Sequence, residues 1–213
     1  MARRQQEKSQ QTQEELMAAA VELFGSKGFF ATTISEITAR AGYAKGSFYR
    51  HWSGKDEIML RIIERKLSSY RSARDERLAQ AASLEEALGI IWDFLENIIA
   101  DRNWSRVFLE FSLHASRDPQ LREEMHKPGH RLSSAIFADL VRPFVKTDYP
   151  PEKIGAINTA LFEGFLIHNI LETGTISRDD VKKAAIALAV SKGEPGGASS
   201  GDAPGEPYKE FQE

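Results

Sequence analysis

Residues 33–51 read TISEITARAGYAKGSFYRH, and this stretch decides the fold of the N-terminal part of the chain. Thr33 and Glu36 have the spacing of a capping box, in which a hydroxyl accepts a backbone N–H and a carboxylate reaches back to the cap residue. A break at Gly42 separates this short helix from a second one over residues 44–51. Two short helices joined by a tight turn that contains glycine are typical of the helix-turn-helix motif, whose second helix enters the major groove of DNA.

The residue types within this stretch are suited to binding DNA and recognising its bases. The small residues that permit a close helix crossing are Ala41, Gly42 and Ala44. The apolar residues that can fill a miniature core are Ile34, Ile37 and Phe48. The polar residues left for phosphates and base edges are Lys45, Ser47, Tyr49 and Arg50. Lys55 adds a cation in the first turn of the next helix, where the helix N-terminus already favours a phosphate.

Apolar residues recur at helical spacing on both sides of the motif. The stripe of the preceding helix consists of Leu16, Ala20, Leu23 and Phe24, and glycines at positions 25 and 28 follow it. A long helix is predicted over residues 55–78. Later stripes predict helices that include residues 84–95, 104–113, 154–172 and 178–190, and a stretch over 121–145 that is interrupted near Pro128. No segment alternates as a strand does, so the sequence predicts an all-α fold.

The composition limits the kinds of site that the chain can form. It has 213 residues and no cysteine, which excludes disulfides, thiolate zinc sites, iron–sulfur clusters and cysteine nucleophiles. A metal site from His114, His126 and His130 is not expected, because Pro128 interrupts the helix that would align the last two. There is no phosphate-binding loop, nucleophile elbow or paired-carboxylate motif, so we expect neither an enzyme nor a cofactor.

The charge is uneven along the chain. Its 28 basic and 31 acidic residues give a net charge of −3, yet the part through Lys55 has eight basic and five acidic residues, a net charge of +3. A basic end on an acidic body indicates a polyanionic partner for the first part only. No apolar run approaches the roughly 18 residues of a membrane span, and the N-terminus lacks a signal-peptide pattern. We therefore expect a cytoplasmic protein.

The motif and its flanks resemble the N-terminal domain of the TetR family of transcriptional regulators. The run FFATTISEITARAGYAKGSFYRHWSGKDEIML at residues 29–60 carries the resemblance, and AAAVELFGSKG at residues 18–28 looks like the first helix of that family. The shared features are the Gly-Phe before the Thr-Thr cap, the Ala-Gly turn, the Gly-Ser-Phe-Tyr-x-His recognition helix and the later Ser-Gly-Lys-Asp. The chain departs from the family at Ala44, where Ser or Thr is the usual cap, and at Trp52, where Phe is usual.

The resemblance implies a homodimer whose two N-terminal modules bind successive major grooves of a palindromic operator. The residues expected at the DNA are Thr33, Tyr43, Ala44, Lys45, Gly46, Ser47, Tyr49, Arg50, His51 and Lys55. By position, residues 43–47 would enter the groove, and Tyr49 and His51 would hold the backbone. Thr33 and Lys55 would each contact a phosphate. Phe48 matches a buried position and is not counted as a reader.

The C-terminal part is rich in aromatic residues, which either fill a helical core or line a cavity. The resemblance implies a cavity for a small effector, and the residue types suggest an apolar or amphipathic one. The residues predicted to line it are Trp92, Trp104, Phe108, Phe111, His114, Phe137, Phe162, Phe165 and His168. Further candidates for polar contacts are Glu110 and Asn158. Core filling is the alternative for any one of the aromatic residues.

The helix that begins near Pro151 carries a candidate dimer surface. Its ridge of small residues at a spacing of four consists of Ala156, Ala160 and Gly164, and its apolar area comes from Leu161, Phe165 and Ile167. The resemblance implies a four-helix interface made of two helices from each chain. Packing within one subunit is the alternative.

These observations predict three parts in the chain. They are a three-helix helix-turn-helix DNA-binding domain with an N-terminal arm (residues 1–54), a larger helical effector-binding and dimerisation domain (55–190), and a disordered tail rich in Gly, Pro and Ser (191–213). The predicted function is a ligand-responsive transcriptional regulator, a repressor that a small hydrophobic or amphipathic effector releases from a palindromic operator. The alternatives are an activator without an effector and a helical protein–protein adaptor.

Overall fold

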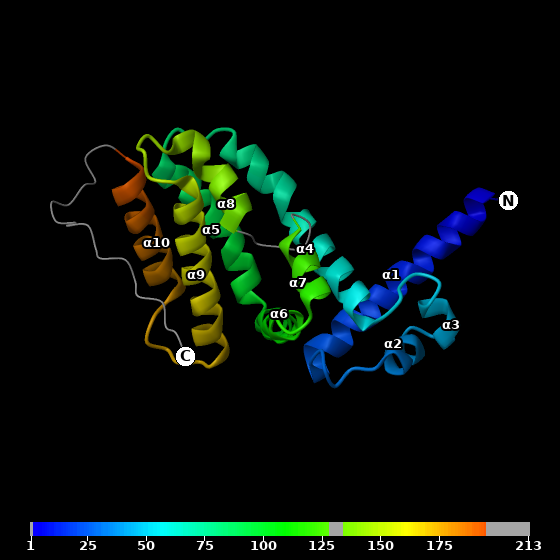
Figure 1. Ribbon diagram of the computed structural model, residues 1–213. Helices are drawn as coiled ribbons and strands as arrows, with labels where there is room; N and C mark the ends of the chain where they lie inside the picture. The colour runs from blue at the N-terminus through cyan, green and yellow to red at the C-terminus, as the bar shows by residue number, and fades with distance from the viewer. Residues whose placement is uncertain (1, 128–133, 195–213) are drawn as a thin grey trace.

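The computed structural model describes residues 2–127 and 134–194. Over these residues the chain forms ten α-helices, one 3-10 helix and no β-strand (Figure 1), which confirms the predicted all-α fold. The elements are α1 (Ala2–Lys27), α2 (Ile34–Arg40), α3 (Lys45–Phe48), α4 (Lys55–Leu78), α5 (Leu84–Ala100), α6 (Arg102–Ala115), α7 (Pro119–His126), α8 (Ser134–Val141), η1 (Arg142–Phe144), α9 (Pro151–Ile170) and α10 (Arg178–Gly193). Among the described residues, no helix has both the length and the apolar character that crossing a bilayer requires.

The helices form two units that α4 connects (Figure 1). Helices α1, α2 and α3 lie together at one end of the molecule and are called the N-terminal unit below. Helices α5, α8, α9 and α10 form a bundle at the other end, and α4 runs from this bundle to the N-terminal unit. Helix α6 contacts α1 as well as α5 and α9, so it joins the two units a second time.

A small apolar core holds the N-terminal unit together. Leu16 and Phe24 of α1, Ile37 of α2 and Phe48 of α3 are buried. Trp52 is buried beside them, and its ring centroid lies 5.3 Å from that of Phe48. Leu16 and Phe24 belong to the apolar stripe that predicted α1, and Ile37 and Phe48 are two of the residues predicted to fill the miniature core. Their burial fixes α3 against α1 and α2.

The capping box at the start of α2 forms as predicted. The Thr33 hydroxyl accepts the Glu36 N–H at 3.2 Å, and the Glu36 carboxylate accepts the Thr33 N–H at 2.9 Å. Lys27, the last residue of α1, also binds this carboxylate. The hydrogen bond from Lys27, followed by those from Thr33, lowers the pKa of Glu36 to about 2. The first turn of α2 is thereby tied to the end of α1.

The bounds of several elements differ from the sequence prediction. Helix α1 begins at Ala2, so the residues expected to form an arm continue the helix. Helix α3 is shorter than predicted, and its cap residue Ala44 makes no side-chain hydrogen bond to the first turn. Helix α10 extends to Gly193, three residues past the predicted end. Residues 195–213, predicted to form a tail, and residues 128–133 near the predicted interruption lie outside the described residues.

A buried hydrogen bond joins α5 to α9 in the bundle, and a second one within α9 completes the partners of the same amide. Trp92 Nε1 donates to Asn158 Oδ1 at 3.0 Å, and Asn158 Nδ2 donates to the Ile154 carbonyl oxygen at 3.0 Å. Trp92 and Asn158 are both buried, and Phe162 packs edge-on against Trp92 with ring centroids 6.3 Å apart. The buried indole and amide thus supply each other with hydrogen-bond partners.

Gly28 follows α1 with a φ of +87°, and a methyl group there would lie 2.9 Å from Oε2 of Glu110. We expect Gly28→Ala to lower the free energy of unfolding by about 1–3 kcal/mol, because left-handed backbone disfavours an L-residue and Glu110 would have to move. Gly89→Ala is the control, since nothing lies within 4 Å of its added methyl group inside α5. It should raise that free energy by about 0.5–1 kcal/mol. Urea unfolding measures both, and an equal loss in the two variants would contradict this expectation.

Candidate nucleic-acid interface

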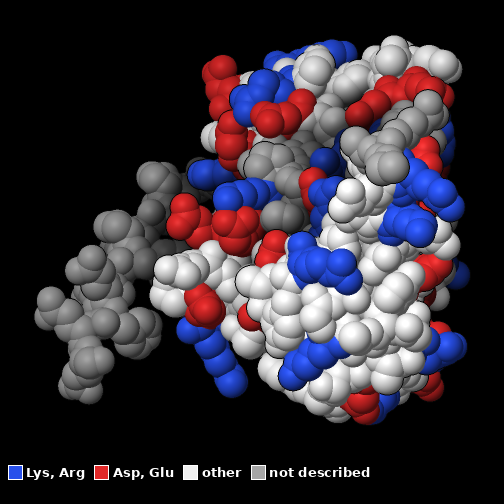
Figure 2. Space-filling model, turned by 90° about the vertical axis from the view of Figure 1, so that its right-hand side faces the viewer, with Lys and Arg blue, Asp and Glu red and all other residues white. Residues whose placement is uncertain are grey.

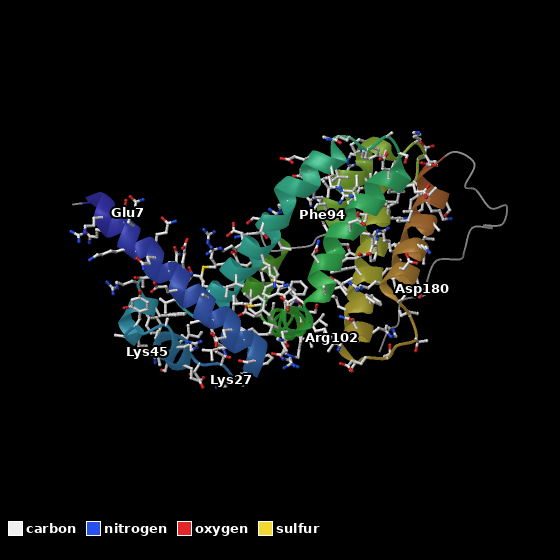
Figure 3. The ribbon with its side chains drawn as sticks, turned by 180° about the vertical axis from the view of Figure 1, so that it is seen from behind. Glu7, Lys27, Lys45, Phe94, Arg102 and Asp180 are labelled. Atoms are coloured by element: carbon white, nitrogen blue, oxygen red, sulfur yellow. The ribbon has the colours of Figure 1, made fainter. Side chains whose placement is uncertain are left out.

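Helix α3 and its caps lie on the outside of the N-terminal unit. The exposed residues there are Ala44, Lys45, Gly46, Tyr49 and Arg50. Figure 3 shows Lys45 at the end of the molecule that is remote from the bundle. In Figure 2, which views this end, basic side chains lie around and within a broad area of uncharged surface. This short helix and the two residues after it therefore present an ammonium, a guanidinium and a phenol, which can bind phosphates and base edges.

Other residues predicted at the DNA are engaged within the protein. Ser47 is buried, and its hydroxyl accepts a hydrogen bond from Arg50 Nη2 at 3.0 Å. Tyr43 is half-buried, and its hydroxyl donates to the Glu15 carboxylate of α1. Thr33 is exposed, but its hydroxyl belongs to the capping box of α2. Ser47 and Tyr43 thus shape the motif, and the exposed polar surface comes mainly from their neighbours.

The residues after α3 form an aromatic layer. Tyr49 packs edge-on against Phe48 with ring centroids 5.6 Å apart, and the ring of His51 lies 5.4 Å from that of Trp52. Partial burial, and after it the charge of Arg50, lowers the pKa of His51. The imidazole is therefore mainly neutral at pH 7. In this state His51 can donate a hydrogen bond to a phosphate but adds no charge.

Lys55 is turned inward, which differs from the phosphate contact predicted from the sequence. Its Nζ donates to the carbonyl oxygens of Phe29, Phe30 and Thr32 at 2.7, 3.3 and 2.8 Å. The same atom lies 4.5 Å from the centre of the Phe29 ring. An ammonium has three N–H groups, so these three bonds use all of them. Burial also lowers the pKa of Lys55. Its role in this structure is to hold the loop between α1 and α2.

Helix α6 also holds this loop, and it holds the end of α1 that precedes the loop. The Phe29 N–H donates to Glu110 Oε2 at 2.8 Å, and Arg106 Nη2 donates to the Gly25 carbonyl oxygen at 2.8 Å. Each bond joins residues that are 81 positions apart in the sequence. No local pattern predicts such pairs, and Glu110 was instead a candidate effector contact. The structure assigns it to the junction between the two units.

Two more of the predicted effector residues, Phe111 and His114, also lie at this junction. The ring of Phe111 packs edge-on against Phe29 with centroids 5.1 Å apart. His114 Nε2 lies 3.0 Å from Asp56 Oδ1 at the start of α4, and its ring packs edge-on against Phe30. These side chains connect α6 to the DNA-binding motif, which is a structural role that the sequence did not indicate.

The remaining predicted effector residues lie on four helices, α5, α6, α8 and α9. Those buried in the bundle, on α5, α8 and α9, are Trp92, Phe137, Phe162 and Phe165. Trp104 and Phe108 are buried on α6, with ring centroids 6.4 Å apart. His168 is exposed, and its Nδ1 lies 3.0 Å from Thr173 Oγ1. The side chains of His126 and His130, considered above as metal ligands, lie outside the described residues.

Known proteins share both the motif and the architecture. The family model of bacterial regulatory proteins of the tetR family matches residues 16–62, from α1 into α4. The HTH-type transcriptional regulator CymR of Pseudomonas putida is 27% identical over 129 residues, which are 61% of this chain and 63% of CymR. Two solved structures share the fold. FadR of Thermus thermophilus in complex with lauroyl-CoA has a TM-score of 0.63 at 18% identity and covers 92% of this chain and 100% of its own. FadR of Bacillus subtilis in complex with stearoyl-CoA has a TM-score of 0.68 at 16% identity, with 84% and 98% covered.

The inward position of Lys55 predicts that its loss destabilises the free protein. Lys55→Met leaves three carbonyl oxygens without their donor, so we expect the free energy of unfolding to fall by about 1–3 kcal/mol, toward the lower end because the site is partly open to water. Lys45→Met is the control and should change it by less than about 0.5 kcal/mol, since Lys45 is exposed. Urea unfolding without DNA makes the comparison. Unchanged stability of Lys55→Met would show that its ammonium is not held in this way.

Proposed function

The chain belongs to the TetR family of DNA-binding transcriptional regulators, and we propose that it is a repressor that a small apolar or amphipathic effector releases from a palindromic operator. The observation that carries this proposal is the exposed surface of α3, held at a fixed angle by the loop between α1 and α2. The family consists of regulators and not of enzymes.

In this proposal α3 enters the major groove through its exposed side. Lys45 and Arg50 supply cations for phosphates or guanine edges, and Gly46 lets the backbone come close to the bases. Tyr49 and the neutral His51 donate hydrogen bonds to the DNA backbone. Lys55 supports this surface from inside instead of touching DNA.

We infer that effector binding reaches the DNA-binding motif through α6. This helix contacts α5 and α9 of the bundle, its Glu110 binds the loop that precedes α2, and its Arg106 binds the end of α1. A ligand that prefers one position of α6 would therefore change the separation of the two recognition helices in a dimer. A difference of about 1–3 kcal/mol in ligand affinity between the two positions is typical of such coupling.

The proposed effector is a long-chain acyl thioester. The likeness in fold to two FadR proteins whose structures contain lauroyl-CoA and stearoyl-CoA supports this class. The buried aromatic side chains of α5, α8 and α9 supply apolar surface of the kind that an acyl chain would contact. The acyl part would lie among these helices and the polar part nearer to solvent.

We also propose that the chain forms a homodimer through α9 and α10. The small residues of the α9 ridge and the apolar residues near it that form this surface are at least partly exposed. They are Ala156, Ala160, Gly164, Ile167 and Leu171. Leu188 of α10 is 39% exposed. Small residues allow helices to approach closely, and the exposed apolar area provides the driving force for association. Phe165, which the sequence assigned to this surface, is buried within the subunit.

Operator binding can be measured by fluorescence anisotropy with DNA from upstream of the gene and with a random duplex. We expect tighter binding to the upstream DNA and an affinity that falls steeply with salt. Lys45→Ala should weaken binding by about 1–3 kcal/mol and reduce the salt slope by about 1, if its ammonium meets a phosphate. Arg122→Ala, at an exposed position of α7, is the control and should change neither. Equal affinity for both duplexes at moderate salt would contradict the proposal.

The same assay tests the effector. Addition of lauroyl-CoA or stearoyl-CoA to the complex should lower the anisotropy, whereas coenzyme A without an acyl chain should not. Retention of the complex at concentrations where calorimetry shows the ester bound would exclude acyl thioesters as releasing effectors.

The proposed dimer predicts a single substitution that separates the subunits. Ala160→Glu places a charge on the small-residue ridge, where burial of an unpaired carboxylate is costly. Light scattering after gel filtration should give twice the chain mass for the wild type and a smaller mass for the variant. Ala79→Glu, at the exposed end of α4, is the control and should remain dimeric. A monomeric wild-type protein would contradict this part of the proposal.

A further inference from the structure

A cavity of about 340 Å³ lies between α1, α4 and α6, where the two units meet. Its apolar lining includes Phe24 of α1, Ile62 of α4, and Trp104 and Val107 of α6, and these four side chains are buried. Val21 of α1 also lines it and is 45% exposed, so the cavity opens to solvent beside this residue. The volume falls at the lower end of the range for small-molecule sites in proteins. We call this space the junction cavity.

The charged groups of the junction cavity are already paired. Lys66 Nζ lies 2.6 Å from Asp101 Oδ2 and 4.5 Å from the centre of the Trp104 ring. Glu22, the other carboxylate in the lining, is bound by Arg40 at 2.7 Å. A charged ligand would have to break one of these pairs or enter without a partner, and both are costly. The lining therefore favours an uncharged ligand.

The same lining offers hydrogen bonding beside flat apolar surface. Asp101 Oδ1 accepts the Trp104 N–H at 3.0 Å and Oδ2 accepts Lys66 Nζ, and each carboxylate oxygen has capacity for a further hydrogen bond. Trp104 and Phe24 present aromatic surface, against which another ring packs favourably. We propose that the junction cavity binds a small uncharged aromatic alcohol of one or two rings, whose hydroxyl donates to Asp101 and whose rings lie against Trp104 and Phe24.

This site is separate from the effector region proposed in the bundle. Its walls come from both units, so an occupant contacts α1 and α6 together and stabilises their packing as seen here. The occupant would then restrain the DNA-binding motif relative to the bundle. This effect on operator affinity rests on the function proposed above, whereas binding of the ligand does not.

Isothermal titration calorimetry of the full chain with 2-naphthol tests the site without DNA. Val21→Trp and Ser26→Trp each add a large ring to the lining at an exposed position, so the fold should tolerate them. We expect either change to weaken 2-naphthol binding about tenfold or more, since loss of a buried ring costs about that much. Leu113→Trp adds the same ring at a 67% exposed position of α6 outside the lining and should bind as the wild type does.

A charged analogue tests the chemical class. Naphthalene-2-carboxylate should bind about tenfold more weakly than 2-naphthol, because its charge has no free partner. Undiminished 2-naphthol binding by both lining variants would overturn the site, as would the absence of binding heat and of a rise in Tm up to about 1 mM ligand. Tighter binding of the carboxylate would overturn the uncharged class. Circular dichroism of each variant confirms that a loss of binding is not a loss of fold.

Discussion

The ammonium of Lys55 and the carbonyl oxygens of the loop between α1 and α2 form the contact on which the rest of the structure depends. This loop sets the angle between α1 and α2, and thereby the place of α3. Lys55 is also the first residue of α4, the helix that leads to the bundle. One ion therefore ties the loop that precedes α2 to the beginning of the helix that leads to the second unit. Charge-assisted hydrogen bonds are stronger than neutral ones, so these bonds hold the loop more firmly than bonds between neutral groups would.

The backbone of Phe29 is hydrogen-bonded to one cation and to one anion. Its carbonyl oxygen accepts from the Lys55 ammonium, and its N–H donates to the Glu110 carboxylate. Its ring lies beneath the same ammonium and against Phe111. Elements from both units thus meet at a single residue of the loop. A displacement of α6 would change the hydrogen bonds of this residue, and in the proposed mechanism Phe29 is therefore where the bundle acts on the DNA-binding motif.

The sequence predicted most of the helices because their signals are local. The capping box at Thr33 and the apolar stripe of α1 involve residues within one or two turns of each other, and both form as expected. The contacts of the candidate site were harder to predict from the sequence. The partner of Lys55 could be a phosphate or a carbonyl oxygen, and only the packing of the loop decides between them. A sequence does not distinguish an aromatic residue that fills a core from one that lies at a junction. The different locations of Phe111 and Phe162 could therefore not be predicted.

Each of the three tryptophans of the chain lies in a different region of the structure. Trp52 belongs to the core of the N-terminal unit, Trp104 to the junction, and Trp92 to the bundle, where its indole N–H is bound to Asn158. Indole emission responds to the polarity and charge around the ring, and within the described part of the chain Trp104 is the tryptophan with an ammonium over its face. Chains that retain a single tryptophan would therefore give three optical reporters, one in the N-terminal unit, one at the junction and one in the bundle.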